Sequence, residues 1–380
     1  MKVDLEEDRY ARQRLLTWWD QDVLASSRVL VVGAGALGNE ILKNLALVGV
    51  GHLTVIDLDT IERSNLSRCV FFRPEDQGRS KAELTAERVR DLNPDIEVEA
   101  VHGSVMALGL GTISGYDLVV AGLDNREARL WVGRASRKLG IAWVDGAIEG
   151  LRGVARVFGP EGPCYECTLS AVDREILSRR TSCALLSAEE VELGKVPTTA
   201  TTSSIIAGVQ CQEAVRLLHR SRGGGSTGMA DGTGMMFVGE TLETYPVTYS
   251  EDPYCPSHDV YGPLVPFPVA ASTRLADLVA AAAVELGPVD AVDLEGDLVI
   301  AGRCTPCDVD ATLRTYAATA ARDAGRCPHC GEMMAFDLRV SITPDDPVID
   351  WPVLELGFPD REVVTVRAGA RRVHYLLEAS

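Results

Sequence analysis

The stretch 29-VLVVGAGALGNEILKNLALVGVGHLTVIDLD-59 decides the fold of this chain. An apolar run over 29–32 leads into Gly33, Gly35 and Gly38, and an amphipathic helical pattern is followed by a second apolar run that ends at Asp57. This order predicts a strand–loop–helix–strand unit whose glycines let a phosphate approach the backbone at a helix N-terminus. Asp57 stands where a carboxylate would meet a ribose hydroxyl. The unit by itself is typical of NAD binding.

The residues that follow favour a nucleoside triphosphate over a redox dinucleotide. Arg68 and Lys81 come after the second strand, and a diphosphate cofactor has little use for two further cations there. Fixed cations are suited to neutralising the charge that builds up on a triphosphate during reaction. Asp124 follows the apolar run 118–121 and is predicted to hold Mg²⁺ beside the triphosphate.

Seven short motifs in one order extend this pattern. They are Tyr10-x-Arg12-Gln13, Gly33-x-Gly35-x-x-Gly38, Asp57-x-Asp59, Asn65-Leu66-x-Arg68, Lys81, Asn93-Pro94, and Asp124-Asn125 followed by Arg129. On these residues the chain resembles the ThiF/MoeB/ubiquitin-activating adenylyltransferases over roughly 8–260. There are two departures: the end of the glycine loop is loosened to Gly35-Ala36, and Cys69 stands where a glutamine is usual.

The resemblance implies an activity and a set of site residues. The enzyme would adenylate the C-terminal carboxylate of a ubiquitin-like protein, using ATP and Mg²⁺, and would then hold the acyl group as a thioester on Cys183. Asp57 would bind the ribose, and Arg68, Lys81, Asn65 and the partner subunit's Arg12 would bind phosphates. The remaining nucleotide-binding positions would be Gly33, Gly35, Gly38, Asp59, Leu123, Asp124 and Asn125.

The resemblance also implies partners: a β-grasp protein of the ubiquitin-like or sulfur-carrier type, a conjugating enzyme, and a second copy of the chain. Three alternatives stay open at this point. One is a sulfur-carrier adenylyltransferase for thiamine or molybdopterin synthesis. The others are an NAD-dependent oxidoreductase and an inactive scaffold with the same fold.

The cysteines predict two structural zinc sites. Cys304/Cys307 and Cys327/Cys330 form two CxxC turns, which can present four thiolates to one tetrahedral ion. Cys164/Cys167 is a third CxxC pair, and the resemblance implies that it is completed after the core sheet, where this chain has Cys255 and His258. Cys69 and Cys211 are interpreted as packing residues.

The whole pattern predicts a doubly wound, mostly parallel Rossmann-like α/β sheet with a smaller zinc-containing α+β domain. The predicted boundaries are 1–254 for the ATP-binding adenylation domain, 255–268 for a linker carrying the end of the first zinc site, and 269–380 for a zinc-ribbon-like docking domain. We also expect an amphipathic helix over 8–25, helices over 203–219 and 274–286, and a hairpin at 295–297.

Composition narrows the function classes. The chain has 380 residues, 46% of them hydrophobic, and a formal net charge of −18. That charge argues against nucleic acid and anionic membranes as partners. Because the first residues are acidic and no long apolar stretch occurs, we expect a cytoplasmic protein.

Overall fold

The computed structural model describes residues 8–170, 172–174, 197–224, 228–321 and 324–379. The chain forms two compact units. The described residues of the first lie within 1–105, 114–174 and 194–260, and those of the second within 106–113 and 261–380.

The first unit is built on an eight-stranded sheet in the order β3-β2-β1-β4-β5-β6-β7-β8. Neighbours from β3 to β5 are parallel, and β6, β7 and β8 extend the sheet in antiparallel fashion. The order reverses between β1 and β4, which is where open α/β sheets bind ligands. The strands are β1 (Arg28–Val32), β2 (His52–Asp57), β3 (Glu97–His102), β4 (Leu118–Ala121), β5 (Trp143–Glu149), β6 (Arg152–Phe158), β7 (Thr233–Val238) and β8 (Glu243–Thr248).

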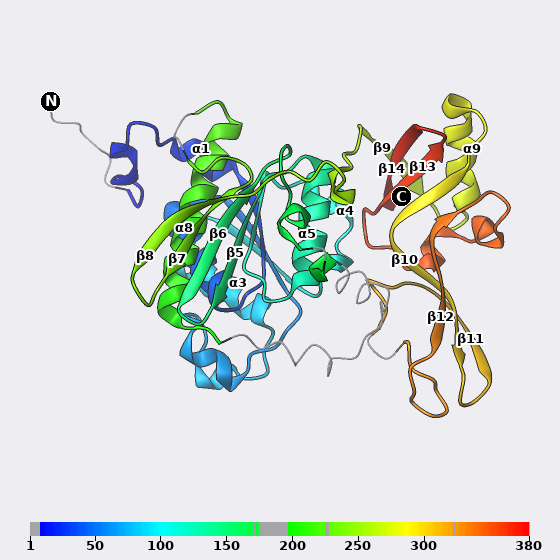
Figure 1. The fold of residues 1–380 in the computed structure, drawn as a ribbon, viewed down its shortest axis with the longest axis horizontal. Coiled ribbons are helices and arrows are strands. Elements are labelled where there is room, and N and C mark those ends of the chain that lie inside the picture. The colour runs from blue at the N-terminus through cyan, green and yellow to red at the C-terminus, as the bar shows by residue number, and fades with distance from the viewer. Residues whose placement is uncertain (1–7, 171, 175–196, 225–227, 322–323, 380) are drawn as a thin grey trace. The chain divides into compact units, whose positions relative to one another are not determined.

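Helices cover this sheet on both faces, and in Figure 1 the strands lie between α8 and α5. The longer helices are α2 (Ala36–Val48), α3 (Lys81–Leu92), α5 (Arg126–Leu139) and α8 (Ala200–Ser221), with a short α1 (Gln21–Ser26) before the first strand. Helix α2 packs against α8 through fully buried residues such as Ile41, Leu45 and Ala214. Cys211 belongs to the same core, so its predicted packing role is confirmed.

Local sequence explains the helix ends. Ser80 accepts a hydrogen bond from Glu83 N and so caps α3. The helix stops at Leu92 because Pro94 disfavours a helical conformation at Asn93. Gly49 adopts the left-handed conformation that ends α2. The predicted nucleotide-binding unit is thus present with the expected bounds.

The amphipathic helix predicted over 8–25 is wrong. The segment instead contains turns, the 3₁₀ helix η1 (Gln13–Leu15) and then α1. Leu15 and Leu16 are exposed, so the apolar residues do not share one buried face. Trp18 packs edge-on against buried His219 of α8, with ring centroids 5.3 Å apart. His219 Nε2 also lies 2.9 Å from Asp20 N, which holds this segment against α8.

The second unit has a six-stranded sheet in the order β11-β10-β13-β14-β9, with β12 also paired to β10. Its strands are β9 (Leu264–Val269), β10 (Ala291–Cys304), β11 (Val309–Tyr316), β12 (Ala335–Ile342), β13 (Val363–Ala368) and β14 (Arg371–Ala379). Helix α9 (Leu275–Leu286) covers this sheet, as the pattern over 274–286 predicts. The short helix α4 (Leu110–Ile113) belongs to the same unit, and Gly111 N donates a hydrogen bond to Arg361 O at 2.9 Å. All of strand β9 except Val269 lies inside the stretch predicted as a linker.

The hairpin predicted at 295–297 is wrong, because β10 runs through these residues as one strand of 14 residues. Gly296 serves a close contact instead of a turn: a Cβ there would lie 2.8 Å from the Tyr316 hydroxyl. Strands β10, β11 and β12 pair with one another, and β11 and β12 extend as a long ribbon at the lower right of Figure 1.

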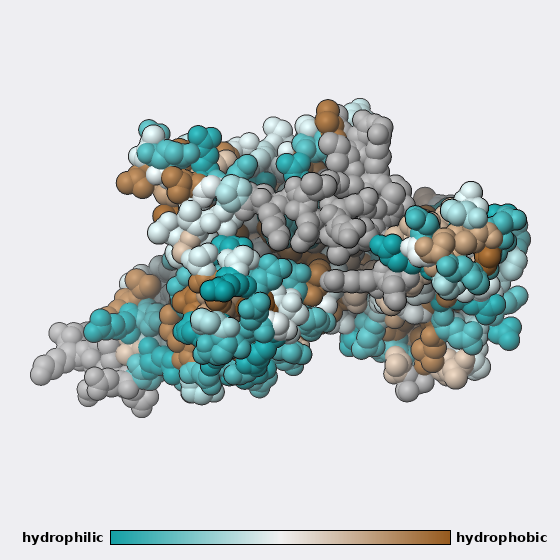
Figure 2. Space-filling view, turned by 90° about the horizontal axis from the view of Figure 1, so that it is seen from below, coloured by the Kyte–Doolittle hydropathy of each residue, from teal (hydrophilic) through white to brown (hydrophobic). Residues whose placement is uncertain are grey.

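In the described part of the chain, no helix combines the length and apolar character needed to cross a bilayer. Figure 2 shows one face of the molecule, on which hydrophobic residues are interspersed among hydrophilic ones.

Candidate functional site

The glycine loop between β1 and α2 approaches the end of β4 closely. Gly33 has φ +95°, and a Cβ on it would lie 2.7 Å from Gly122 O. A Cβ on Gly38 would lie 1.8 Å from Gly33 O. The position of a Cβ on Gly35, in contrast, has no atom within 4 Å. Gly33 and Gly38 are therefore needed for backbone packing, whereas Gly35 leaves open space at the N-terminus of α2, where an anion is favoured.

Asp57 ties this loop to the end of β2. Its carboxylate accepts hydrogen bonds from Ala34 N at 2.7 Å and from Asp59 N at 2.8 Å. Burial raises the pKa of Asp57 above its ordinary value. Each carboxylate oxygen keeps a further lone pair, so Asp57 can still accept a hydrogen bond from a hydroxyl group.

Lys81 is the cation around which the predicted carboxylates gather. It is the first residue of α3, and its Nζ donates to Asp59 Oδ2 at 2.8 Å. Burial acts to lower the pKa of Lys81, but the charges of Asp57, Asp59 and Asp124 outweigh it and raise the pKa above 10.5. Carboxylates from two separate motifs therefore act on one ammonium group, and only Asp59 is paired with it directly.

Asn65 lies on the 3₁₀ helix η2 (Arg63–Ser67), and Arg68 directly follows this helix. Asn65 Oδ1 accepts from Glu62 N at 2.9 Å, and half-buried Arg68 donates to Ser64 O at 2.6 Å. Burial raises the pKa of Cys69 to about 11, so this residue is a thiol at neutral pH. Its packing role is confirmed by a buried cluster with Ile61, Phe72 and Leu84.

The segment 123–125 follows β4 at the same edge of the sheet. Asp124 is exposed, and its side chain makes no hydrogen bond or ion pair with another described residue. Asn125 accepts from Ala128 N at 2.7 Å and so caps α5. An exposed carboxylate whose charge acts on Lys81 is a chemically suitable ligand for Mg²⁺ beside a triphosphate.

The motifs that begin at Tyr10 and at Asn93 lie far apart in the sequence but contact each other in the structure. The Tyr10 hydroxyl accepts a hydrogen bond from Asn93 Nδ2 at 2.8 Å, and Arg9 donates to Leu92 O at 3.0 Å. This contact anchors the segment that carries Arg12. The Arg12 side chain itself is exposed and forms no ion pair within the described ranges.

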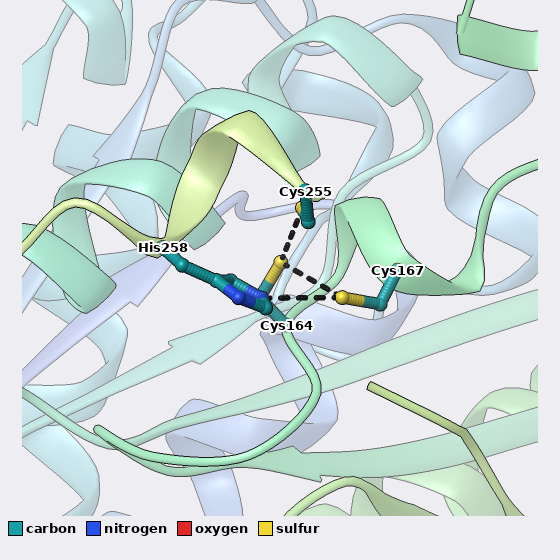
Figure 3. Close-up of side chains that lie close together, drawn as sticks. All are labelled: Cys164, Cys167, Cys255 and His258. Atoms are coloured by element: carbon teal, nitrogen blue, oxygen red, sulfur yellow. Dashed lines mark hydrogen bonds between the residues drawn. The ribbon is translucent and has the colours of Figure 1, made fainter. Parts of the chain in front are cut away.

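The first predicted zinc-binding set comes together in the first unit (Figure 3). Cys164 Sγ lies 3.5 Å from Cys255 Sγ, and Cys167 Sγ lies 3.2 Å from His258 Nε2. Burial raises the pKa of Cys164, so thiolates here need a bound cation. His258 Nδ1 lies 3.5 Å from a Glu251 carboxylate oxygen, the arrangement that orients a zinc-ligating histidine.

A second layer of polar contacts joins the two halves of this set. Ser257 donates to Glu166 in a short hydrogen bond, and Arg134 pairs with the same carboxylate at 2.8 Å. Glu166 and Ser257 lie between the ligands of each half, so the contact brings the two ligand pairs into register. Glu166, Ser257 and Arg134 carry no recognisable sequence pattern, so their contact is visible only in the structure.

The second predicted set is formed by Cys304, Cys307, Cys327 and Cys330 in the second unit. The four sulfur atoms lie within 4.8 Å of one another, close enough to share one ion. Backbone N–H groups of His329 and Cys330 lower the pKa of Cys327 to about 6, which favours the thiolate that zinc requires. Both sets therefore fit a structural, four-coordinate zinc ion.

The fold and the order of these site residues agree with a comparison against protein families, in which the model described as the ThiF family matches residues 10–243. The chain belongs to the ThiF family. It is 37% identical over 262 residues to the SAMP-activating enzyme E1 of Haloferax volcanii, covering 66% of this chain and 87% of that protein. It is 40% identical over 157 residues to the NEDD8-activating enzyme E1 catalytic subunit of Schizosaccharomyces pombe, covering 40% of this chain and only 35% of that subunit.

Solved structures also resemble this ThiF-family chain. The crystal structure of E. coli MccB with ATP superimposes with a TM-score of 0.55 and 20% identity, covering 67% of this chain and 75% of MccB. At that identity the likeness shows the fold alone. The doubly wound sheet predicted from the sequence is thereby confirmed.

In this ThiF-family chain, the structure brings together Asp57, Asp59, Lys81 and Asp124 and both sets of metal-ligating residues. Arg12 stands apart from them, and Cys183 lies outside the described residues. Arg129 belongs to the motif that begins at Asp124, but the sequence assigns it no role. In the structure it is buried and donates a hydrogen bond to Leu123 O at 2.5 Å. Its signal in the sequence is its place in the first turns of the helix that follows Asp124-Asn125.

Proposed function

We propose that this chain is an ATP-dependent adenylyltransferase that activates the C-terminal carboxylate of a ubiquitin-like protein. The observation that carries the proposal is the ion pair of Lys81 with Asp59 at 2.8 Å, with the charges of Asp57 and Asp124 also acting on Lys81, at the ligand-binding edge of a ThiF-family sheet. Similarity to a SAMP-activating enzyme across 87% of that protein supports the substrate class.

Each site residue has a role in holding the nucleotide. Asp57 accepts hydrogen bonds from the ribose hydroxyls, and the N-terminus of α2 at Gly35 receives a phosphate. Lys81, Arg68 and the Asn65 amide bind the triphosphate. Lys81 leaves its ion pair with Asp59 for the phosphates, and its raised pKa keeps it charged. Asp124 is the ligand for Mg²⁺, which when bound adds positive charge at the triphosphate.

The reaction follows from this placement. The terminal carboxylate of the partner protein attacks the α-phosphorus, the bond to the pyrophosphate oxygen breaks, and an acyl-adenylate remains. Lys81 and Arg68 stabilise the negative charge that develops on the phosphates. Holding both reactants in one crevice lowers the entropic part of the barrier.

The second step uses Cys183, which lies outside the described residues. Its thiolate attacks the acyl carbon, a thioester forms, and AMP leaves. A conjugating enzyme then receives the acyl group. Arg12 of the partner subunit completes the phosphate site in a homodimer, and two Zn²⁺ ions per chain, one in each cysteine set, serve the fold.

The test combines pyrophosphate exchange with a gel. The chain is incubated with MgATP and small β-grasp proteins that end in glycine, and ATP–pyrophosphate exchange is measured for the wild type, Asp124→Ala and Asp117→Ala. Asp117 lies directly before β4, at the end opposite to Asp124, and controls for the loss of an aspartate beside that strand. We expect exchange to fall by about a hundredfold or more in Asp124→Ala only.

A non-reducing gel tests the acceptor. An ATP-dependent, thiol-sensitive shift that disappears in Cys183→Ala supports the thioester. Exchange without a shift would keep the adenylation step and remove Cys183 from the mechanism. Equal exchange in Asp124→Ala and wild type would refute the site assignment.

A further inference from the structure

A buried guanidinium group lies directly beside the loop that carries Asp124. Arg129 projects from α5, and its side chain is only 8% exposed. Its Nη2 donates to Leu123 O at 2.5 Å and to Gly146 O at 3.1 Å. Arg129 thus joins the carbonyl group before Asp124 to the neighbouring strand β5.

The charge of this group is balanced by a carboxylate with no solvent exposure. Asp145 of β5 accepts from Arg129 Nε through Oδ1 at 2.8 Å, and from Arg156 Nε of β6 through Oδ2 at 2.9 Å. Burying three charged groups is costly and brings little net stability compared with an apolar packing of the same volume. The arrangement therefore calls for an explanation besides stability.

The two arginines differ in one respect. Arg129 contacts both Asp145 and the loop carbonyl of Leu123. Arg156 contacts the other oxygen of Asp145 and lies over the Tyr165 ring, and among the described residues it makes no hydrogen bond to 123–125. The chain thus contains a matched pair of buried arginines, of which one reaches the site.

The loop is held on both sides of Asp124. Arg129 binds the carbonyl of Leu123, and the side chain of Asn125 binds Ala128 N. Asp124 lies between them and is exposed, with no hydrogen bond or ion pair to the described residues. The backbone is therefore fixed while the carboxylate stays available to a ligand.

We propose that Arg129 is a positioning residue that fixes the Leu123–Asp124 backbone, so that the Asp124 carboxylate meets the metal-bound triphosphate in the correct place. Asp145 holds the Arg129 guanidinium in the orientation that this requires. The inference rests on the proposed role of Asp124 in binding Mg²⁺.

The test measures binding at equilibrium, so it does not depend on turnover. Isothermal titration calorimetry gives the Kd for ATP in buffer with Mg²⁺ and in buffer without Mg²⁺, and the ratio of the two is the magnesium enhancement. We expect Arg129→Lys to lower this enhancement by about tenfold, as loss of an outer contact to a metal ligand does. Arg156→Lys, which alters the other contact to Asp145, should keep the wild-type enhancement.

Folding is controlled separately. Urea denaturation of both variants shows whether each is folded and how much stability it has lost. If Arg129→Lys does not fold, Arg129→Gln replaces it, because the neutral amide leaves Asp145 paired with Arg156. Arg129→Gln should lower the enhancement to the same degree.

Two results would contradict the inference in different ways. If the Arg129 and Arg156 variants change the enhancement equally while Asp124→Asn abolishes it, the buried group is structural, and the role of Asp124 stands. If Asp124→Asn itself keeps the wild-type enhancement, the assignment of Asp124 in the proposed function fails, and the inference fails with it.

Discussion

Replacing Gly35 by alanine tests whether the open space at the N-terminus of α2 receives a phosphate. A Cβ at this position would meet no atom within 4 Å, and the backbone has φ −76°, which alanine also adopts. The added methyl group therefore fills only space that the folded chain leaves empty. Any large effect on the protein must come through a ligand.

The expected magnitudes follow from this geometry. Alanine is a poorer N-cap than glycine, but it also lowers the entropy of the unfolded chain, so the free energy of unfolding should change by less than about 1 kcal/mol. A phosphate seated at this backbone would be displaced by the methyl group. We expect the ATP affinity to fall at least about tenfold, which corresponds to about 1.4 kcal/mol.

Two other glycines provide the controls. In Gly38→Ala the Cβ would lie 1.8 Å from Gly33 O, far inside van der Waals contact, so unfolding should become easier by about 3 kcal/mol. In Gly208→Ala, on α8, the Cβ also has no atom within 4 Å. That variant should gain about 0.5 to 1 kcal/mol of stability and bind ATP as the wild type does.

Urea denaturation followed by circular dichroism measures the stabilities, and calorimetry measures ATP binding. If Gly35→Ala keeps the wild-type affinity for ATP, the phosphate does not lie at this loop, and the reasoning from the empty space is refuted. If Gly35→Ala loses as much stability as Gly38→Ala, the loop packing has been misjudged.

Three further predictions concern charge, metal and assembly. The pKa of Asp57 is raised in the folded state. Its contribution to stability is therefore present below the ordinary pKa of 3.8 and is lost as the pH rises through the raised pKa. Asp57→Asn should flatten the pH dependence of the free energy of unfolding between these two pKa values. Elemental analysis should find two zinc ions per chain, and Cys164→Ser and Cys304→Ser should each retain one; a single zinc in the wild type would remove one of the two sites. If Arg12 acts across a dimer, Arg12→Ala and Lys81→Ala should each lose exchange activity, and mixing them should restore part of it, because one site then has its own Lys81 and the partner subunit's Arg12. No recovery in mixed dimers, verified by differential tagging, would place Arg12 in its own subunit's site or outside the reaction.

The sequence by itself determined the nucleotide-binding unit and the CxxC pairs that can ligate a metal ion. An apolar strand, a glycine loop and a capped amphipathic helix are specified by residues close together in the chain, so 29–59 folds as its pattern predicts. The set Cys304, Cys307, Cys327 and Cys330 was also predictable, because CxxC spacing reflects the geometry that zinc imposes on neighbouring thiols. The completion of Cys164 and Cys167 by Cys255 and His258 was implied by the resemblance to the family.

Predictions that depended on periodicity alone were less successful. The apolar residues of 8–25 suggested a helix, but Trp18 packs against His219 of α8, about 200 residues away along the chain. Gly296 suggested a turn, but its lack of a side chain instead makes room for the hydroxyl group of Tyr316. In both places a contact distant in sequence overrode the local preference.

Only the tertiary structure decided which of the site residues act on one another. It brought the charges of Asp57, Asp59 and Asp124 to Lys81, and it paired Tyr10 with Asn93. It also gave Arg129 its contact with the loop before Asp124. The physical reason is that parallel strands bring their carboxyl ends to one edge of the sheet whatever their separation in the chain, and a pattern read along the sequence does not contain those distances.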